Sequence, residues 1–110
     1  MATKTDRLQG TLSLLILKAL ASRGPLHGYG ITVLIETIAG EPLKVEEGSL
    51  YPALHRMEQD GLIRAQWGTS ENNRRARYYS ITATGRRQLE AEQQRWAELT
   101  EAVGRMLRFA

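Results

Sequence analysis

Three segments in the N-terminal half of the chain repeat apolar side chains at the spacing of one helix face, and a glycine follows each of them. Apolar residues recur at positions i, i+3, i+4 and i+7, which is the pattern of an amphipathic helix with one buried side. The sequence therefore predicts three short helices that pack on one another around a single core. They cover residues 8–21, 27–39 and 47–60, and the glycines that follow them are Gly24, Gly40 and Gly61.

The first predicted helix is apolar on most of its circumference. Leu12 and Leu15 lie on one side of it, whereas Leu14 and Leu17 lie on the other. A helix of this kind must be covered from two directions, by its own domain twice or by its domain and a partner chain. We therefore expect Leu12 and Leu15 to take part in pairing two copies of the chain.

Two β-like runs follow the helices, at residues 62–67 and 77–81. The residues between them are rich in glycine, serine and asparagine, a composition typical of turns, so the pair predicts a β-hairpin. Ile63, Ala65 and Trp67 alternate with polar residues and are expected to form its buried face. The order of three helices and a hairpin is that of a winged helix-turn-helix.

A long final helix is predicted after Thr82 or Thr84, either of which can be its N-cap, and it continues to about Phe109. One side of this helix is more apolar than a chain of this size can cover with its own core, so we expect it to join two chains into a homodimer. The expected fold is mainly α with a small β-hairpin, a winged-helix domain over residues 1–82 and a dimerisation helix over residues 83–110. The residues expected to pair are Leu89, Trp96, Leu99, Val103, Met106 and Leu107.

The charges of the chain are unevenly distributed, although its formal net charge is only +3. Residues 26–61 contain two Lys/Arg against six Asp/Glu, whereas residues 62–88 contain six Arg against one Glu. A concentrated basic segment fits a nucleic acid partner, but taken alone it fits a solvated hairpin equally well. In a winged helix-turn-helix, arginines at the hairpin tip neutralise backbone phosphates or enter the minor groove. Arg74, Arg75 and Arg77 are the candidates for this role.

The third predicted helix offers a surface that fits the major groove of DNA. With Leu50, Leu54 and Met57 facing inward at 100° per residue, its outward face is small near the N-terminus and then polar. A helix that enters the groove needs little bulk at first and hydrogen-bond donors further along. Arg56 is the best candidate for a bidentate contact to guanine. Tyr51 lies on the flank, and the other outward residues are Gly48, Ser49, Pro52, His55 and Gln59.

Composition argues against several other functions. The chain has no cysteine, which excludes disulfides and thiolate metal sites, and neither of its two histidines has a partner at a metal-binding spacing. No nucleophile, base and orienting group stand at a recognisable spacing, so we expect no cofactor and no enzymatic activity. The most apolar stretch, residues 11–21, contains Lys18 and is too short to span a bilayer. We expect no membrane segment, no signal peptide and a cytoplasmic protein.

Several blocks of the sequence resemble those of the PadR family of transcriptional regulators. The most specific block is Gly-Ser-Leu-Tyr-Pro-Ala-Leu-His-Arg-Met-Glu at residues 48–58. The resemblance covers about residues 8–107, and because one helix follows the hairpin it points to the shorter branch of the family. The other matching blocks are residues 26–30, 61–63, 77–82 and 84–86.

The resemblance implies a winged-helix DNA-binding domain, a homodimer joined by C-terminal helices, and repression that a small molecule or a stress signal relieves. It also implies that Tyr29 lies near a phosphate, where the second helix begins. Further residues that the resemblance places against the DNA are Ser49, Tyr51, Pro52 and His55.

We accordingly predict a sequence-specific DNA-binding regulator, a homodimeric repressor of an inverted-repeat operator. The alternative is a winged helix that serves only as a protein-interaction module. The outward face of the third helix favours DNA, because it carries Ser49, His55 and Arg56 in place of large apolar residues. Trp96 also has two interpretations, a packing anchor of the dimer or a platform for a planar aromatic effector. Packing is the commoner role of a tryptophan on such a stripe.

Overall fold

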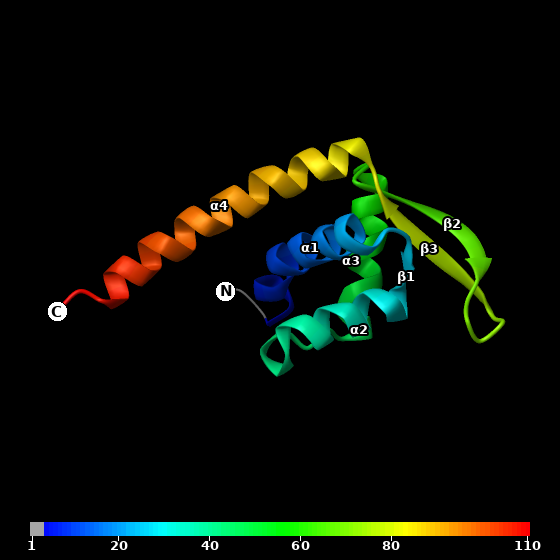
Figure 1. Ribbon diagram of the computed structural model, residues 1–110, viewed down its shortest axis with the longest axis horizontal. Coiled ribbons are helices and arrows are strands. Elements are labelled where there is room, and N and C mark those ends of the chain that lie inside the picture. Colours follow the sequence, from blue (N-terminus) through cyan, green and yellow to red (C-terminus); the bar gives the residue numbers. More distant parts are fainter. Residues whose placement is uncertain (1–3) are drawn as a thin grey trace.

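The computed structural model describes the backbone of residues 4–110, with side chains from residue 11 onward, and consists mainly of helices with one small sheet (Figure 1). This confirms the predicted fold class and the predicted order of helices, hairpin and final helix. The elements are α1 (Lys4–Arg23), β1 (Leu26–His27), α2 (Gly28–Ala39), the short 3₁₀-helix η1 (Glu41–Leu43), α3 (Glu47–Gln59), β2 (Ile63–Thr69), β3 (Arg75–Ile81) and α4 (Ala83–Leu107).

The hydrophobic core lies around α1, which contacts α2, α3, β3 and α4. Ile16, Leu17 and Leu20 of α1 have no exposed surface, so the chain covers both sides of this helix over that stretch. Leu12, expected to face a partner chain, is also buried in this core, whereas Leu15 stays half-buried. Of these two leucines, Leu15 therefore keeps surface that a second copy can contact.

The helix ends follow the local chemistry of the sequence. Gly40 and Gly61 have φ angles of 78° and 75°, a region that glycine enters without steric cost, and the preceding helices end there. Thr82 caps α4, because its Oγ1 accepts a hydrogen bond from the Gly85 backbone N at 3.0 Å. Of the two threonines considered as caps, the structure thus selects Thr82.

The sheet has three strands in the order β1-β3-β2, all antiparallel, where the sequence predicted two. The additional strand is two residues long, and it pairs Leu26 with Tyr79 and His27 with Tyr78. The hairpin strands are also longer than predicted, so that the loop between them shortens to residues 70–74. We refer to β2, β3 and this loop as the wing.

The first turns of α4 pack into the core, whereas the rest of the helix projects away from the body (Figure 1). A Cβ atom at Gly85 would overlap the carbonyl oxygen of Leu62, so only glycine permits this close approach. Leu89, expected at the dimer interface, is buried in the chain's own core. The division at residues 82 and 83 stays a prediction. Within residues 4–110, no helix combines the length and apolar character needed to cross a membrane.

Candidate nucleic-acid interface

Helix α3 presents the predicted inward and outward faces. Leu50, Leu54 and Met57 are buried, which confirms the expected apolar face. Pro52 and His55 are exposed on the opposite side. The helix begins at Glu47, as expected from the position of a proline that cannot donate to the carbonyl four residues before it. Ser49 and Arg56 are half-buried at the edges of the outward face.

The segment that leads into α3 is fixed to α2 by a hydrogen bond. The backbone N of Val45 donates to Oε2 of Glu36 over 3.0 Å, and Glu36 lies near the end of α2. This bond fixes the connection between the two helices of the helix-turn-helix to α2. It therefore restricts how the outward face of α3 can turn relative to α2.

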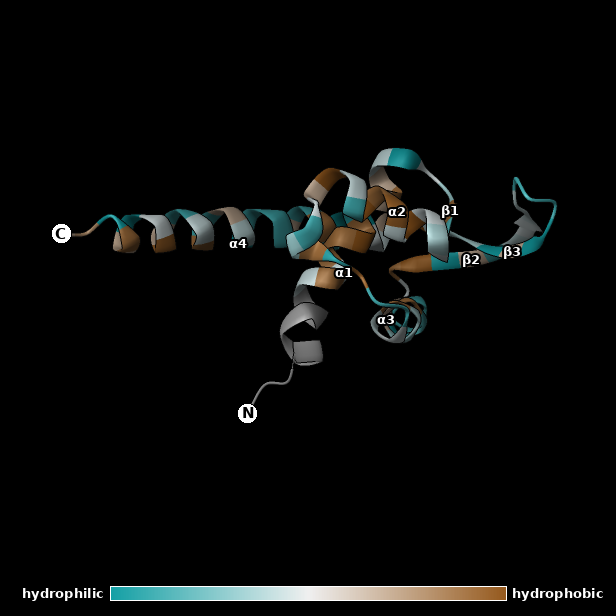
Figure 2. Ribbon diagram, turned by 90° about the horizontal axis from the view of Figure 1, so that it is seen from below, coloured by the Kyte–Doolittle hydropathy of each residue, from teal (hydrophilic) through white to brown (hydrophobic). Residues whose placement is uncertain are grey.

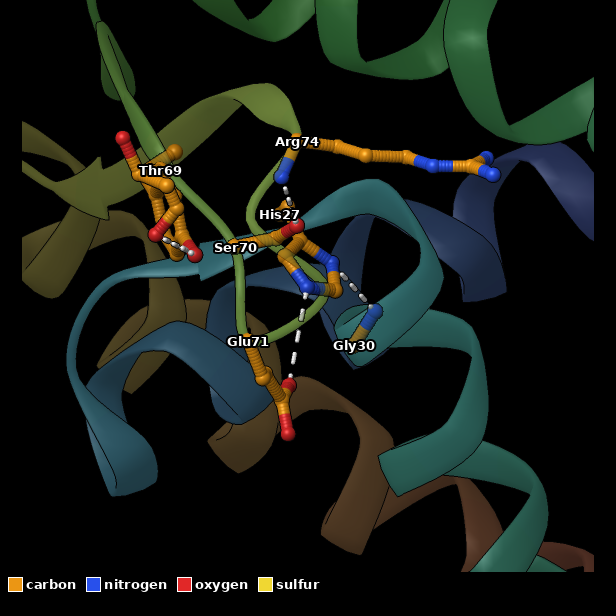
Figure 3. Close-up of polar contacts among 7 residues, drawn as sticks. His27, Gly30, Thr69, Ser70, Glu71 and Arg74 are labelled. Carbon is orange, nitrogen blue, oxygen red and sulfur yellow. Dashed lines mark hydrogen bonds and ion pairs between the residues drawn. The ribbon is translucent and has the colours of Figure 1, made fainter.

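The loop at the tip of the wing is held by its own hydrogen bonds (Figure 3). The Ser70 backbone N donates to the Arg74 carbonyl at 2.7 Å. The Oγ of Ser70 accepts a hydrogen bond from the Arg74 backbone N at 3.3 Å. Asn73 has a φ of 58°, a left-handed conformation that asparagine tolerates well, so it forms the turn as expected. The ordered loop leaves the Arg74 side chain extended away from the backbone (Figure 3).

The N-terminus of α2 meets the wing at His27. Nδ1 of His27 accepts a hydrogen bond from the Gly30 backbone N at 2.9 Å and caps the helix, while Nε2 lies 3.9 Å from Oε1 of Glu71 in the wing loop (Figure 3). Tyr29, next along the helix, is 73% exposed. The N-terminal end of α2 thus borders the surface that the wing loop covers, and a helix N-terminus attracts anions.

Tyr51 of α3 lies across the start of α2, which accounts for Gly28. A Cβ atom at Gly28 would be 2.7 Å from the Tyr51 hydroxyl oxygen, closer than real contacts allow. The glycine therefore lets the tyrosine ring lie against the backbone of α2. From the sequence alone, Gly28 is equally compatible with such a close approach and with a loosely wound first turn of the helix.

Helices α2 and α3 and the wing enclose an open cleft of about 800 Å³, the wing cleft. Five of the nine predicted DNA-contacting residues line it, and they come from all three elements. Ser49, Pro52, His55 and Arg56 do not line the cleft and lie on α3 beside it. The structure thus separates the predicted residues into an arginine-rich cleft and a helix face. The five residues in the cleft are Tyr29, Tyr51, Arg74, Arg75 and Arg77.

The three arginines that line the wing cleft have different surroundings. The Arg77 guanidinium is 3.0 Å from a carboxylate oxygen of Glu58 on α3, so this arginine joins the wing to the helix. Among the side chains described, those of residues 11–110, no ion pair to a carboxylate is found for Arg74 or Arg75. Burial raises the pKa of the Tyr79 phenol, although the neighbouring Arg77 acts in the opposite direction. Of the three arginines in the cleft, Arg74 and Arg75 are thus the ones whose charge is available to an anion.

Trp67 is a residue of this surface that the sequence placed wrongly. It was expected in the buried face of the hairpin, yet 56% of it is exposed, because β2 and β3 extend beyond the core. Its ring lies 4.4 Å from the guanidinium carbon of Arg75 and lines the wing cleft. Strand alternation contained the signal for this contact, since Trp67, Arg75 and Arg77 point to the same side of the sheet.

The residues expected at a dimer interface fall into two groups. Leu12 and Leu89 are covered by the core, whereas the residues beyond the first turns of α4 are exposed. Leu15 lines a second groove, of about 360 Å³ between α1 and α2, whose apolar lining includes Leu34 and Ile38. Within residues 11–110, whose side chains the structure describes, no group of three or more histidine or acidic side chains is placed to hold a metal ion. We call the exposed series of α4 the α4 stripe: Trp96, Leu99, Val103, Met106 and Leu107.

Comparison with known proteins gives consistent matches. Residues 16–91 match the model of the transcriptional regulator PadR-like family. A PadR-like transcriptional regulator from Bacillus cereus, known from its crystal structure, is 30% identical with a TM-score of 0.80, over 94% of this chain and 97% of that chain. A transcriptional regulator of Mycobacterium tuberculosis is 31% identical over 83 residues, 76% of this chain and 74% of the relative.

One relative is much longer than this chain. An uncharacterized 37.1 kDa transposon protein of Streptomyces fradiae is 41% identical over 90 residues. The match covers 82% of this chain but only 24% of that protein, so this chain corresponds to about a quarter of its length.

Proposed function

The chain belongs to the PadR-like family of transcriptional regulators, and from this we propose that it is a homodimeric repressor that binds an inverted-repeat operator in double-stranded DNA. It would act in the cytoplasm, on DNA that is accessible there. Its family relatives include transcriptional regulators with the same fold. The proposal adds a binding mode and an assembly to that family membership.

The observation that carries this proposal is the wing cleft beside α3. Arg74 and Arg75 face a cleft whose opposite side is formed by Tyr29 and Tyr51, at the start of α2 and on α3. Cations, phenolic hydroxyls and a helix N-terminus are all groups that bind backbone phosphates. The adjacent face of α3 carries Ser49, His55 and Arg56, which suit base edges in the major groove. Phosphate binding and base reading would thus occur side by side.

The dimer is supported by the α4 stripe. Trp96 is 51% exposed and Leu107 is 80% exposed, and side chains of this size on one helix face are typical of an interface. A second copy related by a two-fold axis would cover this stripe and present a second α3. The two α3 helices would then read half-sites about one DNA turn, roughly 34 Å, apart.

The proposal includes a small-molecule effector that relieves repression. Trp96 is the residue on which a planar aromatic compound would stack between paired α4 helices, as the family resemblance implies. The test titrates planar aromatic compounds into the Trp67→Phe variant, whose single remaining tryptophan is Trp96. Quenching of that fluorescence together with weaker operator binding supports the effector site. Unchanged fluorescence and affinity assign Trp96 to packing alone.

Selection of bound duplexes from a random pool tests the main proposal. We expect the recovered sequences to share an inverted repeat, and sedimentation of the complex to show two chains per duplex. A chain that stays monomeric at about micromolar concentration contradicts the dimer. Failure to bind any duplex at about 50 mM salt, where electrostatic binding is strong, contradicts DNA binding itself.

A further inference from the structure

An exposed tryptophan in the wing has one face occupied by arginine. Trp67 lies on β2, more than half of it is exposed, and it packs outside the hydrophobic core. The guanidinium carbon of Arg75 is 4.4 Å from its ring centroid, and that of Arg77 is 6.0 Å away. Both distances lie within the range of cation–π attraction. The contact between this ring and arginine is therefore not a result of burying the tryptophan in the core.

Strand pairing dictates this contact. In the antiparallel ladder Trp67 is paired with Arg77, and Arg75 is two residues further along β3 on the same side of the sheet. Directly opposite and diagonal neighbours on one face of a sheet are close enough for long side chains to interact. The register thus places two arginines beside Trp67.

The same contacts lead back to the helix proposed to read DNA. Arg77 is paired with Glu58, which lies on α3, and the Trp67 ring is within cation–π distance of both Arg77 and Arg75. A continuous series of contacts therefore runs from α3 to the outer part of the wing. We call the series Glu58, Arg77, Trp67 and Arg75 the wing ladder.

We infer that Trp67 is a positioning residue that holds the Arg75 guanidinium in place for contact with a backbone phosphate, an inference that rests on the proposed function. Stacking uses the flat face of the guanidinium and leaves its N–H donors free at the edge, in the fork that matches phosphate oxygens. Arg77 already uses one edge on Glu58, so Arg75 is the member of the ladder that is left to bind. Trp67 acts through Arg75 and needs no contact with DNA.

The test is a double-mutant cycle on DNA affinity, with Trp67→Leu, Arg75→Ala and the double variant. Affinity is measured by fluorescence anisotropy on a labelled duplex of mixed sequence, about three helical turns long, from about 50 to 200 mM salt. We expect Trp67→Leu to weaken binding about two- to fivefold, the size of a surface cation–π contact, and to flatten the salt dependence as Arg75→Ala does. In the double variant, Trp67→Leu should add little to the loss caused by Arg75→Ala.

Two further variants separate positioning from a structural role. Trp67→Phe keeps an aromatic face and should restore most of the affinity and the salt slope, whereas Arg64→Ala removes a cation of β2 on the opposite side of the sheet and should change neither. Circular dichroism and thermal unfolding check that each variant is folded. If Trp67→Leu unfolds the wing, the Phe variant still decides, because a salt slope as flat as that of Arg75→Ala contradicts positioning by an aromatic face.

Three other results would overturn the inference. Wild-type affinity and slope in Trp67→Leu show that the stacking has no role in binding. Losses from Trp67→Leu and Arg75→Ala that multiply in the double variant show that the two residues act independently. A wild-type chain that binds no duplex removes the proposed function itself, a failure seen before any variant is made.

Discussion

Two parts of the chain project from the helical body, the wing and the distal half of α4 (Figure 2). They differ in whether their exposed large side chains contact partners within the same chain. In the wing, the Arg75 guanidinium lies over the Trp67 ring, and Arg77 pairs with Glu58 of α3. In α4, hydrophobic positions recur between hydrophilic ones and stay exposed, and ion pairs such as Glu101–Arg105 stay on the helix itself. An exposed aromatic residue thus has a different meaning in each part, depending on whether its own chain supplies a partner.

The largest expected effect comes from charging the α4 stripe. Leu99→Asp places a carboxylate in the proposed dimer interface, where it has no partner and must be desolvated. We expect a monomer in sedimentation and a loss of operator affinity of at least about a hundredfold, because two linked half-site contacts become one. Circular dichroism should show an intact fold, since Leu99 packs outside the core.

Gln94→Asp is the matched control for that change. At 100° per residue Gln94 lies on the opposite side of α4 from Leu99, so the same charge is introduced away from the stripe. This variant should remain dimeric with unchanged affinity. A dimeric Leu99→Asp protein with full affinity would show that the stripe does not pair two chains.

Arg56→Ala separates base reading from the general attraction of the wing. We expect binding to the selected operator to weaken by about 1–3 kcal/mol, with little change on unrelated duplexes, because a bidentate contact to guanine would be lost. Thermal unfolding is measured alongside, since Arg56 is half-buried. Equal losses on all sequences would remove Arg56 from the base-reading role.

Arg74→Ala should have the opposite profile and a smaller effect. Its loss weakens binding to every duplex alike and lowers the slope of log affinity against log salt by about 0.9, the value for one phosphate contact. Arg64→Ala removes the same charge from outside the wing cleft and should leave the slope unchanged. A change confined to the operator would mean that Arg74 reads sequence.

The smallest effect concerns the base of the wing and depends on pH. Burial raises the pKa of Tyr79 above 10.0, its value in an unfolded chain, so the folded state holds this proton more tightly. The stabilisation is complete below pH 10.0 and is lost as pH rises through the folded-state pKa. Urea unfolding above pH 10.0 should therefore show a steeper fall in stability for the wild type than for Tyr79→Phe. Parallel curves would contradict this.

Periodicity predicted the body of the fold well. The buried face of α3, with Leu50, Leu54 and Met57, and the helix ends at Gly40 and Gly61 are where the pattern placed them. These features depend on local propensity and on one apolar face, and residues close together in the sequence determine both. The order of these elements along the sequence is by itself enough to indicate a winged helix-turn-helix.

The features that periodicity missed depend on contacts between distant residues. Strand β1 has two residues and forms because β3 offers it hydrogen bonds. Alternation placed Trp67 on the core side of the hairpin but could not tell where the core ends. Periodicity also could not tell which apolar residues the chain buries by itself. Leu12 and Leu89 lie on helices that were expected to pair two chains, yet both are buried in the core of this chain. Arg77 is linked to Glu58 across 19 residues, a pairing that no local pattern shows.

The close packing of Gly85 on the Leu62 carbonyl places the first turn of α4 directly against the end of the helix-turn-helix core. A helix of 25 residues is roughly 37 Å long, so a small change in its angle at the N-terminal end displaces its C-terminal end by several ångströms. In the proposed symmetric dimer, a change in the angle of α4 would change the distance between the two winged-helix domains. The interior of each domain would stay unchanged. The angle of α4 would thus set the distance between the two α3 helices and would not alter the surface of either one.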